Sequence, residues 1–194
     1  MARKSLAVLA IMFVVQSVFS CIPCDCPKSQ IYDVKYKSIA LTAYDTSGLQ
    51  DKVMEDTINK NAFGITVAVN FELERIAKLL DINGNFGFNA AMACDCVGNE
   101  YNYSDPIDRI EIFVTDSKTS QTREITDHFA IYGDANGGLI SLKQYFNNRH
   151  VLYEKFQLRL VTFDLIPSAA TFTVNTYLES GKKLSKQTGQ INFF

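Results

Sequence analysis

Every second residue from Phe63 to Leu73 is apolar, and this alternation constrains the fold more than any other feature of the sequence. Successive side chains of a strand point to opposite faces, so period-two alternation is typical of a strand that buries one face. The apolar positions are Phe63, Ile65, Val67, Val69, Phe71 and Leu73. We expect further strands over residues 31–44, 86–94, 107–115, 156–163, 170–178 and 190–194.

About seven short strands separated by turn residues predict an all-β fold, an antiparallel β-sandwich over residues 31–194 as a single domain. An immunoglobulin-like topology is the first expectation, although the chain has no Trp and cannot form the usual cysteine–tryptophan core. One or two short helices are expected, over Asp51–Asn59 and over Leu142–Asn148, where Ser141 is a suitable cap. A parallel α/β sheet is not expected, because strands and helices do not alternate.

The first 20 residues have the layout of an export signal. Arg3 and Lys4 precede an apolar run from Leu6 to Val15, and small residues follow. The run is shorter than the roughly 20 residues that a transmembrane helix needs. A buried helix of a globular core is the alternative. We expect residues 1–20 to be a signal peptide and residues 21–30 to be a tether.

Cys21 is the candidate for lipid attachment. Val18-Phe19-Ser20-Cys21 resembles a bacterial lipobox, in which a small residue precedes an acylated cysteine, although Phe19 is bulky for its position. A plain signal-peptidase cut after Ser20 competes with this reading. Because one acyl chain gives only marginal membrane binding, several chains would be needed for a firm anchor.

The other four cysteines form two Cys-x-Cys pairs and are candidates for disulfides. Cys24 and Cys26 flank Asp25, and Cys94 and Cys96 flank Asp95. An even number of cysteines in an exported chain favours bridges, and a bridge within one Cys-x-Cys would close a strained ring. Two bridges between the pairs are therefore expected, with their connectivity open. A four-thiolate zinc site is the alternative, but structural zinc sites usually space their cysteines by two to four residues.

These cysteines and the C-terminal residues carry a resemblance to a family. The Cys at the cleavage site, the two Cys-x-Cys pairs and the C-terminal Phe-Thr-Val…Gly-Lys…Thr-Gly-Gln-Ile-Asn-Phe segment are similar to small Bacteroidetes lipoproteins of the type called domain of unknown function 5034. The resemblance covers nearly the whole mature chain, and its motifs are of low specificity. It implies an envelope lipoprotein with a β-sandwich body, and it implies no activity. We expect the lipid anchor to hold the protein at the outer membrane, with display on the periplasmic or the surface face left open.

Composition and motifs favour a protein without catalytic activity. The formal net charge is −2, and no basic block indicates a nucleic-acid partner. His128 and His150, the only histidines, lie near no recognisable nucleophile, and neither a phosphate-binding loop nor a metal-ligand cluster is evident, so no cofactor is expected. Glu72 and Glu74 alternate with apolar residues, as on a solvated strand face. Asp105, Asp108 and Glu111 resemble ordinary surface acids.

Two oxygen-rich turns are weak candidates for calcium. Asp81, Asn83 and Asn85 have the spacing of an EF-hand loop, but Gly87 falls one place late and Met92 stands where a bidentate Glu belongs. A second candidate turn contains Asp134, Asn136 and Gly137. Asp and Asn are common in turns for conformational reasons alone, so no metal site is expected.

We therefore expect a non-catalytic envelope lipoprotein that binds a glycan or a protein partner. Loops 81–87 and 133–138 are candidates for recognition, Tyr101 and Tyr103 could stack on a sugar, and Thr57 fits an acceptor pattern for O-linked glycans. Two alternatives remain open: a hydrolase acting on envelope carbohydrate or peptide, and a pilus-type assembly component that exchanges a strand.

Overall fold

A computed structural model describes residues 29–47, 52–53, 57–78, 98–133, 138–147 and 153–194. The chain forms two compact units. The smaller contains Met1–Tyr32 and Arg75–Tyr101, and the larger contains Asp33–Glu74 and Asn102–Phe194. The sandwich belongs to the larger unit. The predicted boundary at residue 20 lies outside the described residues.

Strands dominate the described chain, and the predicted all-β class with few short helices is confirmed. The strands are β1 (Gln30–Asp45), β2 (Lys52–Val53), β3 (Thr57–Ile58), β4 (Phe63–Lys78), β5 (Glu100–Asn102), β6 (Ile107–Asp116), β7 (Thr122–Glu124), β8 (Phe129–Tyr132), β9 (Leu139–Ser141), β10 (Lys155–Leu160), β11 (Ala169–Leu178), β12 (Lys183–Gln187) and β13 (Ile191–Phe193). The described helices are the 3₁₀ turns η1 (Lys60–Ala62) and η2 (Thr126–His128) and the α-helix α2 (Leu142–Tyr145).

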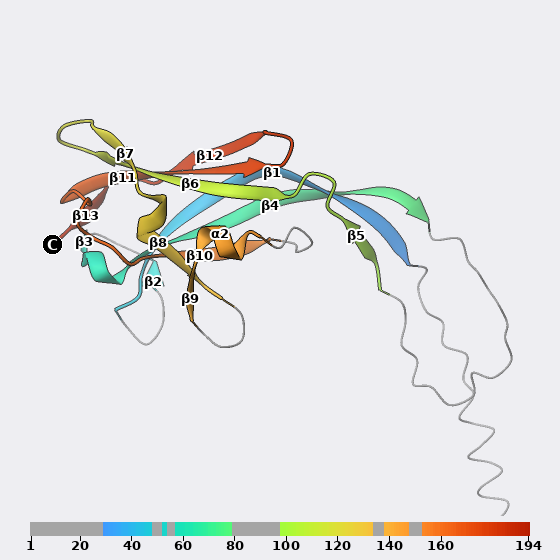
Figure 1. Cartoon of the computed structure of the whole chain (residues 1–194), viewed down its shortest axis with the longest axis horizontal. Helices are drawn as coiled ribbons and strands as arrows, with labels where there is room; N and C mark the ends of the chain where they lie inside the picture. Colours follow the sequence, from blue (N-terminus) through green and yellow to red (C-terminus); the bar gives the residue numbers. More distant parts are fainter. Residues whose placement is uncertain (1–28, 48–51, 54–56, 79–97, 134–137, 148–152) are drawn as a thin grey trace, which may run out of the picture. The chain divides into compact units, whose positions relative to one another are not determined.

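The strands form two sheets that face each other (Figure 1). One sheet has the order β2-β1-β4-β10-β8-β9, with β5 also paired to β1. The other has the order β3-β13-β11-β6-β7, with β12 also paired to β11. β12 and β13 occupy successive parts of the same edge of β11. The orders β1-β4-β10-β8 and β12-β11-β6-β7 correspond to A-B-E-D and G-F-C-C′ of immunoglobulin-like sandwiches, as the sequence predicts.

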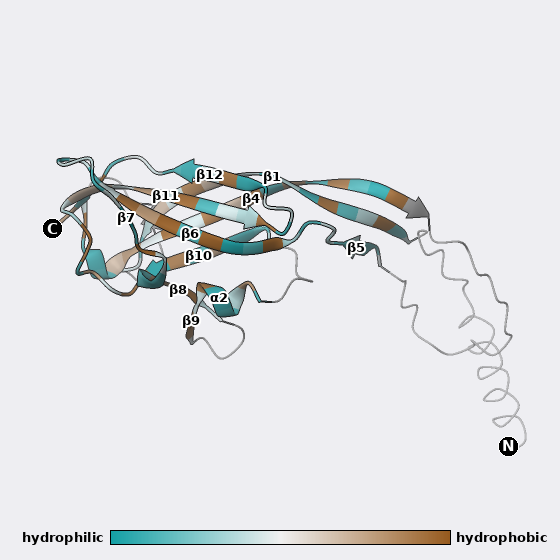
Figure 2. Cartoon of the chain, turned by 45° about the horizontal axis from the view of Figure 1, so that its top comes forward, coloured by the Kyte–Doolittle hydropathy of each residue, from teal (hydrophilic) through white to brown (hydrophobic). Residues whose placement is uncertain are grey.

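The core between the sheets consists of the apolar side chains that alternate with polar ones along the strands. Figure 2 shows apolar and polar residues following one another along β4, β6 and β11. Phe63, Ile65 and Val67 of β4 are fully buried. The rings of Phe63 and Phe172, from opposite sheets, lie 4.8 Å apart between centroids. Packing across the sheets thus uses the residues from Phe63 to Val69 that the period-two pattern assigns to the buried face, whereas Leu73 at the end of the pattern is exposed.

One break in this alternation shapes the surface of the second sheet. Ile107 and Ile110 of β6 are both buried although they are three residues apart. The pairing with β11 skips Asp108: Tyr177 faces Arg109 and Leu178 faces Ile107. Asp108 is therefore the extra residue of a β-bulge, a feature that redirects neighbouring side chains.

The other secondary-structure predictions have mixed outcomes. The strands expected over 31–44, 63–73, 107–115, 156–163, 170–178 and 190–194 are confirmed with shifted ends, and the strand expected over 86–94 lies outside the described residues. The helix expected over Asp51–Asn59 is wrong, because β2 and β3 occupy its described residues. β3 pairs in parallel with β13, a contact that local propensity does not reveal. The short helix after Ser141 is confirmed as α2.

Candidate functional site

A groove of about 520 Å³ lies in the larger unit, between β6, η2 and α2. Its floor is apolar and contains Ile110, Phe129, Leu142 and Phe146. All four of these side chains are buried and belong to the core of the sandwich. The groove therefore rests on the packed scaffold, which fixes its shape.

Helix α2 forms one wall of the groove because its sequence places a cap and two core residues at the right spacing. The Ser141 hydroxyl accepts a hydrogen bond from the Gln144 NH at 3.2 Å, which caps the helix. Leu142 and Phe146 are four residues apart and point to the same face. Both are buried, so the helix is held against the sandwich.

The β6 wall carries Arg109 between two carboxylates. Its guanidinium lies 3.3 Å from Asp108 Oδ2 and 3.3 Å from Glu111 Oε1. It also lies over the ring of Tyr177, 4.1 Å from the centroid. The hydrogen bond to Glu111, followed by that to Asp108, raises the pKa of Arg109. The β-bulge at Asp108 brings these three side chains together.

The η2 wall is fixed by Thr126. Its hydroxyl donates to Glu124 Oε1 at 2.9 Å and accepts from the Ile112 NH at 3.0 Å. This links η2 to the neighbouring strand β6. Of the four carboxylates that line the groove, three are thus already engaged, namely Asp108, Glu111 and Glu124.

Asp127 of η2 and Lys143 of α2 line the groove without such contacts. Among the described residues, neither side chain forms a hydrogen bond or an ion pair, and both residues are exposed. They carry opposite charges, one on η2 and the other on α2. They are therefore the charged groups of the groove that a ligand can engage without breaking an internal contact.

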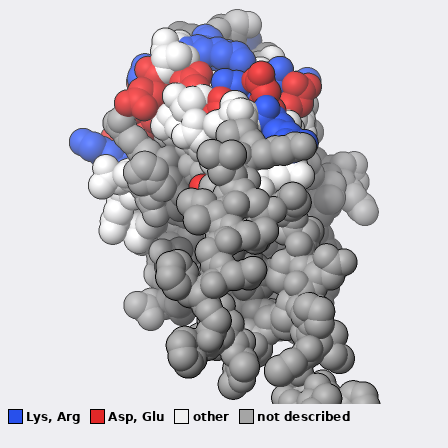
Figure 3. Space-filling model, turned by 90° about the vertical axis from the view of Figure 1, so that its right-hand side faces the viewer, with Lys and Arg blue, Asp and Glu red and all other residues white. Residues whose placement is uncertain are grey.

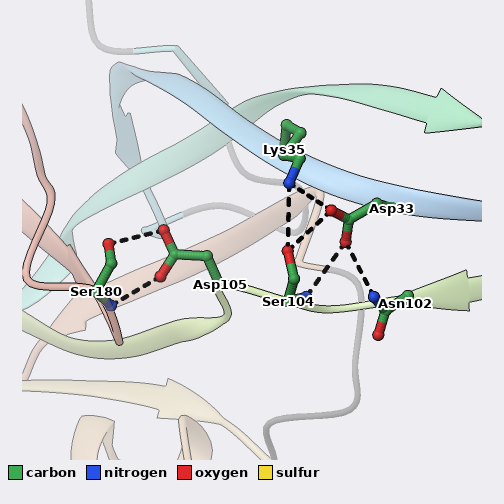
Figure 4. Close-up of polar contacts among 6 residues, drawn as sticks. All are labelled: Asp33, Lys35, Asn102, Ser104, Asp105 and Ser180. Atoms are coloured by element: carbon green, nitrogen blue, oxygen red, sulfur yellow. Dashed lines mark hydrogen bonds and ion pairs between the residues drawn. The ribbon is translucent and has the colours of Figure 1, made fainter. Parts of the chain in front are cut away.

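A second polar arrangement surrounds Asp33 of β1 (Figure 4). Its carboxylate accepts hydrogen bonds from Asn102 Nδ2 at 3.3 Å and from the Ser104 hydroxyl at 2.9 Å, and it forms an ion pair with Lys35. The Asp33 side chain is only 7% exposed. These contacts attach the segment before β6 to β1, so the arrangement is structural.

Asp105 fixes the hairpin between β11 and β12 in the same region. Its two carboxylate oxygens accept from the NH and the hydroxyl of Ser180, each at 2.8 Å (Figure 4). The interpretation of Asp105 as an ordinary surface acid therefore misses a contact that crosses 75 residues of sequence. A single sequence gives no signal for such a pairing.

Other predicted residues lie apart from the groove. Tyr101 is exposed and stacks on Tyr32, with centroids 6.2 Å apart, whereas Tyr103 packs against the core. Thr57 is exposed on β3. The half-buried His128 contacts the Thr162 carbonyl through Nδ1 at 3.1 Å.

The predicted solvated face of β4 is confirmed. Glu72 and Glu74 are exposed, and Glu72 forms an ion pair of 2.9 Å with Lys37. On the face drawn in Figure 3, the described residues show Lys and Arg side chains interspersed with Asp and Glu side chains.

The remaining candidates lie outside the described residues. They are Cys21, Cys24, Cys26, Cys94, Cys96, Asp81, Asn83, Asn85, Asp134, Asn136, Gly137 and His150. In the described part of the chain, no cluster of three or more His, Cys, Asp or Glu residues could hold a metal ion. No helix within the same residues is long and apolar enough to cross a membrane.

Comparison with known proteins adds no assignment. No family model matches the chain, and no curated protein or solved structure matches it. The resemblance to the domain of unknown function 5034 therefore stays a prediction.

Proposed function

We propose that this chain is a non-catalytic lipoprotein of the bacterial cell envelope that binds a glycan or a protein partner in the groove between β6, η2 and α2. In this proposal Cys21 is acylated and holds the protein at the outer membrane. The export layout of residues 1–20 and the lipobox-like sequence before Cys21 support this location in the cell envelope.

The observation that carries the binding proposal is the composition of the groove. Ligand sites are typically concave and apolar, with a few polar groups that fix orientation. Here buried apolar side chains line the same groove as Asp127 and Lys143, two opposite charges with no internal partner among the described residues. A ligand that offers hydroxyl, amide or charged groups at both ends would satisfy both side chains.

The engaged carboxylates support binding rather than hydrolysis. General acid–base catalysis needs a carboxyl group that can exchange a proton with the substrate. Asp108 and Glu111 are both paired with Arg109, and Glu124 accepts from Thr126. Asp127 is left as a single carboxylate, whereas most glycosidases use two.

The strand-exchange alternative gains no support from the terminal strand. β13 pairs with β11 on one side and with β3 on the other. Its side chains Ile191 and Phe193 are buried in the core. A donor strand would need to be held more loosely than this.

The test is binding of the purified mature protein to an array of bacterial and host glycans, and to a matched peptide array. Asp127→Ala and Lys143→Ala should each weaken binding to any retained probe by about ten- to a hundredfold, since a hydrogen bond to a charged group contributes roughly 1.5–3 kcal/mol. Because neither side chain forms a hydrogen bond or an ion pair with a described residue, the melting temperature should not change.

The matched controls are Asp164→Ala and Lys186→Ala, which remove an exposed charge of the same sign away from the groove. They should bind as the wild type does. Equal loss in controls and groove variants would contradict the groove as the binding site. Cleavage of a probe that disappears in Asp127→Asn would contradict the non-catalytic role.

A further inference from the structure

The backbone groups of β6 alternate between its two neighbouring strands. Toward β7, the Asp116 NH donates to the Gln121 carbonyl, and the Ile112 carbonyl accepts from the Ile125 NH. Hydrogen-bonded pairs alternate with non-bonded pairs along an antiparallel ladder. The even-numbered residues of β6 from Ile112 to Asp116 therefore direct their NH and carbonyl groups toward the β7 side.

Ile110 belongs to the same series but has no described strand beside it on that side. The odd-numbered residues of β6 face β11 instead, as the hydrogen bond from the Ser117 NH to the Ala169 carbonyl shows. The described pairing of β7 with β6 covers Phe113–Thr115, and η2 follows. Ile110 thus directs its NH and carbonyl away from β11, to the side of β6 where the groove lies.

The backbone of Ile110 is buried and unpaired. The residue is 4% exposed, and no described residue forms a hydrogen bond with its NH or its carbonyl. The great majority of buried backbone groups in folded proteins are paired, so an unpaired donor and acceptor on one residue indicate a missing partner. An open strand edge is a template for pairing with another extended chain.

The charges of the groove favour a basic partner. Four carboxylates and two cationic side chains line it, an excess of two negative charges. Asp108 and Glu111 share the guanidinium of Arg109. Glu124 of β7 and Asp127 of η2 form no ion pair with a described residue. These two carboxylates are therefore complementary to a lysine or arginine side chain.

We propose that the partner in this groove is a basic segment of another protein, which binds in an extended conformation and pairs with the backbone of Ile110. A carbonyl of the segment accepts from the Ile110 NH, and an NH of the segment donates to the Ile110 carbonyl. A lysine or arginine of the segment contacts Glu124 and Asp127. This inference rests on the proposed function and selects a protein partner over a glycan.

The first measurement is retention of the purified mature protein on an array of nine-residue peptides of alternating threonine and valine. Lysine, alanine or glutamate replaces each position in turn. At the best position, the lysine peptide should bind about tenfold better than the glutamate peptide, because like charges repel in the groove. The double variant Glu124→Gln, Asp127→Asn should lose this preference. Asp164→Asn, which removes an exposed charge outside the groove, should keep it.

Methylation of single peptide nitrogens tests the strand pairing. Alternate NH groups of an extended chain point to the same side. Methylation of the nitrogen that donates to Ile110 should weaken binding about five- to tenfold, because one hydrogen bond is lost. Methylation of the next nitrogen along the peptide, which points away from β6, is the matched control and should have no effect.

Hydrogen exchange gives a readout within the protein itself. The Ile110 amide should become protected when the best lysine peptide binds. The Arg109 and Glu111 amides, which face β11, are the internal controls, and their exchange should not change. An Ile110 amide that is as protected as these neighbours before peptide is added would show that water, a second copy or the chain itself occupies the edge. That result would overturn the inference.

The remaining outcomes separate this inference from the proposed function. Retention of a glycan that depends on Asp127, without retention of any peptide, would overturn the inference and leave the proposed function intact. Peptide binding without the alternating effect of methylation and without protection at Ile110 would overturn the strand pairing. If no retained probe depends on Asp127 or Lys143, both proposals are overturned.

Discussion

Ser104 donates two hydrogen bonds to Asp33, from its NH to Oδ1 at 3.3 Å and from its hydroxyl to Oδ2 at 2.9 Å. Burial raises the pKa of Asp33, but hydrogen bonds from Lys35 and Ser104 outweigh this effect and hold the pKa below its ordinary value of 3.8. Folding thus favours the ionised carboxylate, which joins β1 to the segment before β6.

This lowered pKa predicts an acid-dependent loss of stability. A carboxyl group whose pKa is lower in the folded state stabilises the fold above the pKa of the unfolded chain, and the contribution is lost as the pH falls through the folded-state pKa. The difference in unfolding free energy between wild type and Asp33→Asn should therefore be largest near neutral pH and shrink below pH 3.8. Denaturant unfolding at a series of pH values measures it.

Ser104→Ala provides a graded comparison, because it removes the hydroxyl donor and keeps the NH donor. Its stability at neutral pH should lie between that of the wild type and that of Asp33→Asn. A difference between wild type and Asp33→Asn that stays constant with pH would contradict the role given to the carboxylate.

The hairpin between β11 and β12 depends on Gly181. Its φ is 85°, a conformation that costs a residue with a side chain about 1–2 kcal/mol. Gly181→Ala should therefore lower the melting temperature by a few degrees. Gly189→Ala is the matched control: neither glycine has a described heavy atom within 4 Å of an added Cβ, and Gly189 lacks the positive φ. Equal effects would show that the positive φ does not matter.

Thr176 places a hydroxyl without a described hydrogen-bond partner in the core. The residue is fully buried on β11, where it pairs with Ile110 and Leu184. An unsatisfied buried polar group costs about 1–3 kcal/mol, so Thr176→Val should raise the unfolding free energy by about 1 kcal/mol. Thr171→Val is the comparison, because the Thr171 hydroxyl accepts from Gln187 at 2.9 Å. Thermal or denaturant unfolding should show a gain for Thr176→Val only, and a loss at position 176 would contradict it.

The sequence predicts the strands that bury one face and misses those whose partners are distant. The alternation over Phe63–Leu73 identifies β4, and Ser141 identifies α2. β12 contains one apolar residue, Leu184, because it lies along the edge of β11 and its other side chains are exposed. β3 depends on pairing with β13, which is distant in the sequence.

The groove is less predictable than the sheets. Asp108 and Glu111 resemble surface acids because a single sequence does not show that η2 and α2 lie beside β6. One local signal was present: Ile107 and Ile110 are both apolar at a spacing of three, which breaks the period of two and indicates the bulge. The partnership of Arg109 with Tyr177 could not be predicted, because it forms between strands.

The most direct test of the envelope assignment is the intact mass of the protein extracted from bacterial membranes. The chain should lack residues 1–20, begin at Cys21 and carry the mass of several acyl chains, and Cys21→Ser should abolish this mass and the membrane association. A water-soluble chain that begins at Cys21 without acyl groups, or one that keeps residues 1–20, would contradict the lipid anchor on which the proposed function rests.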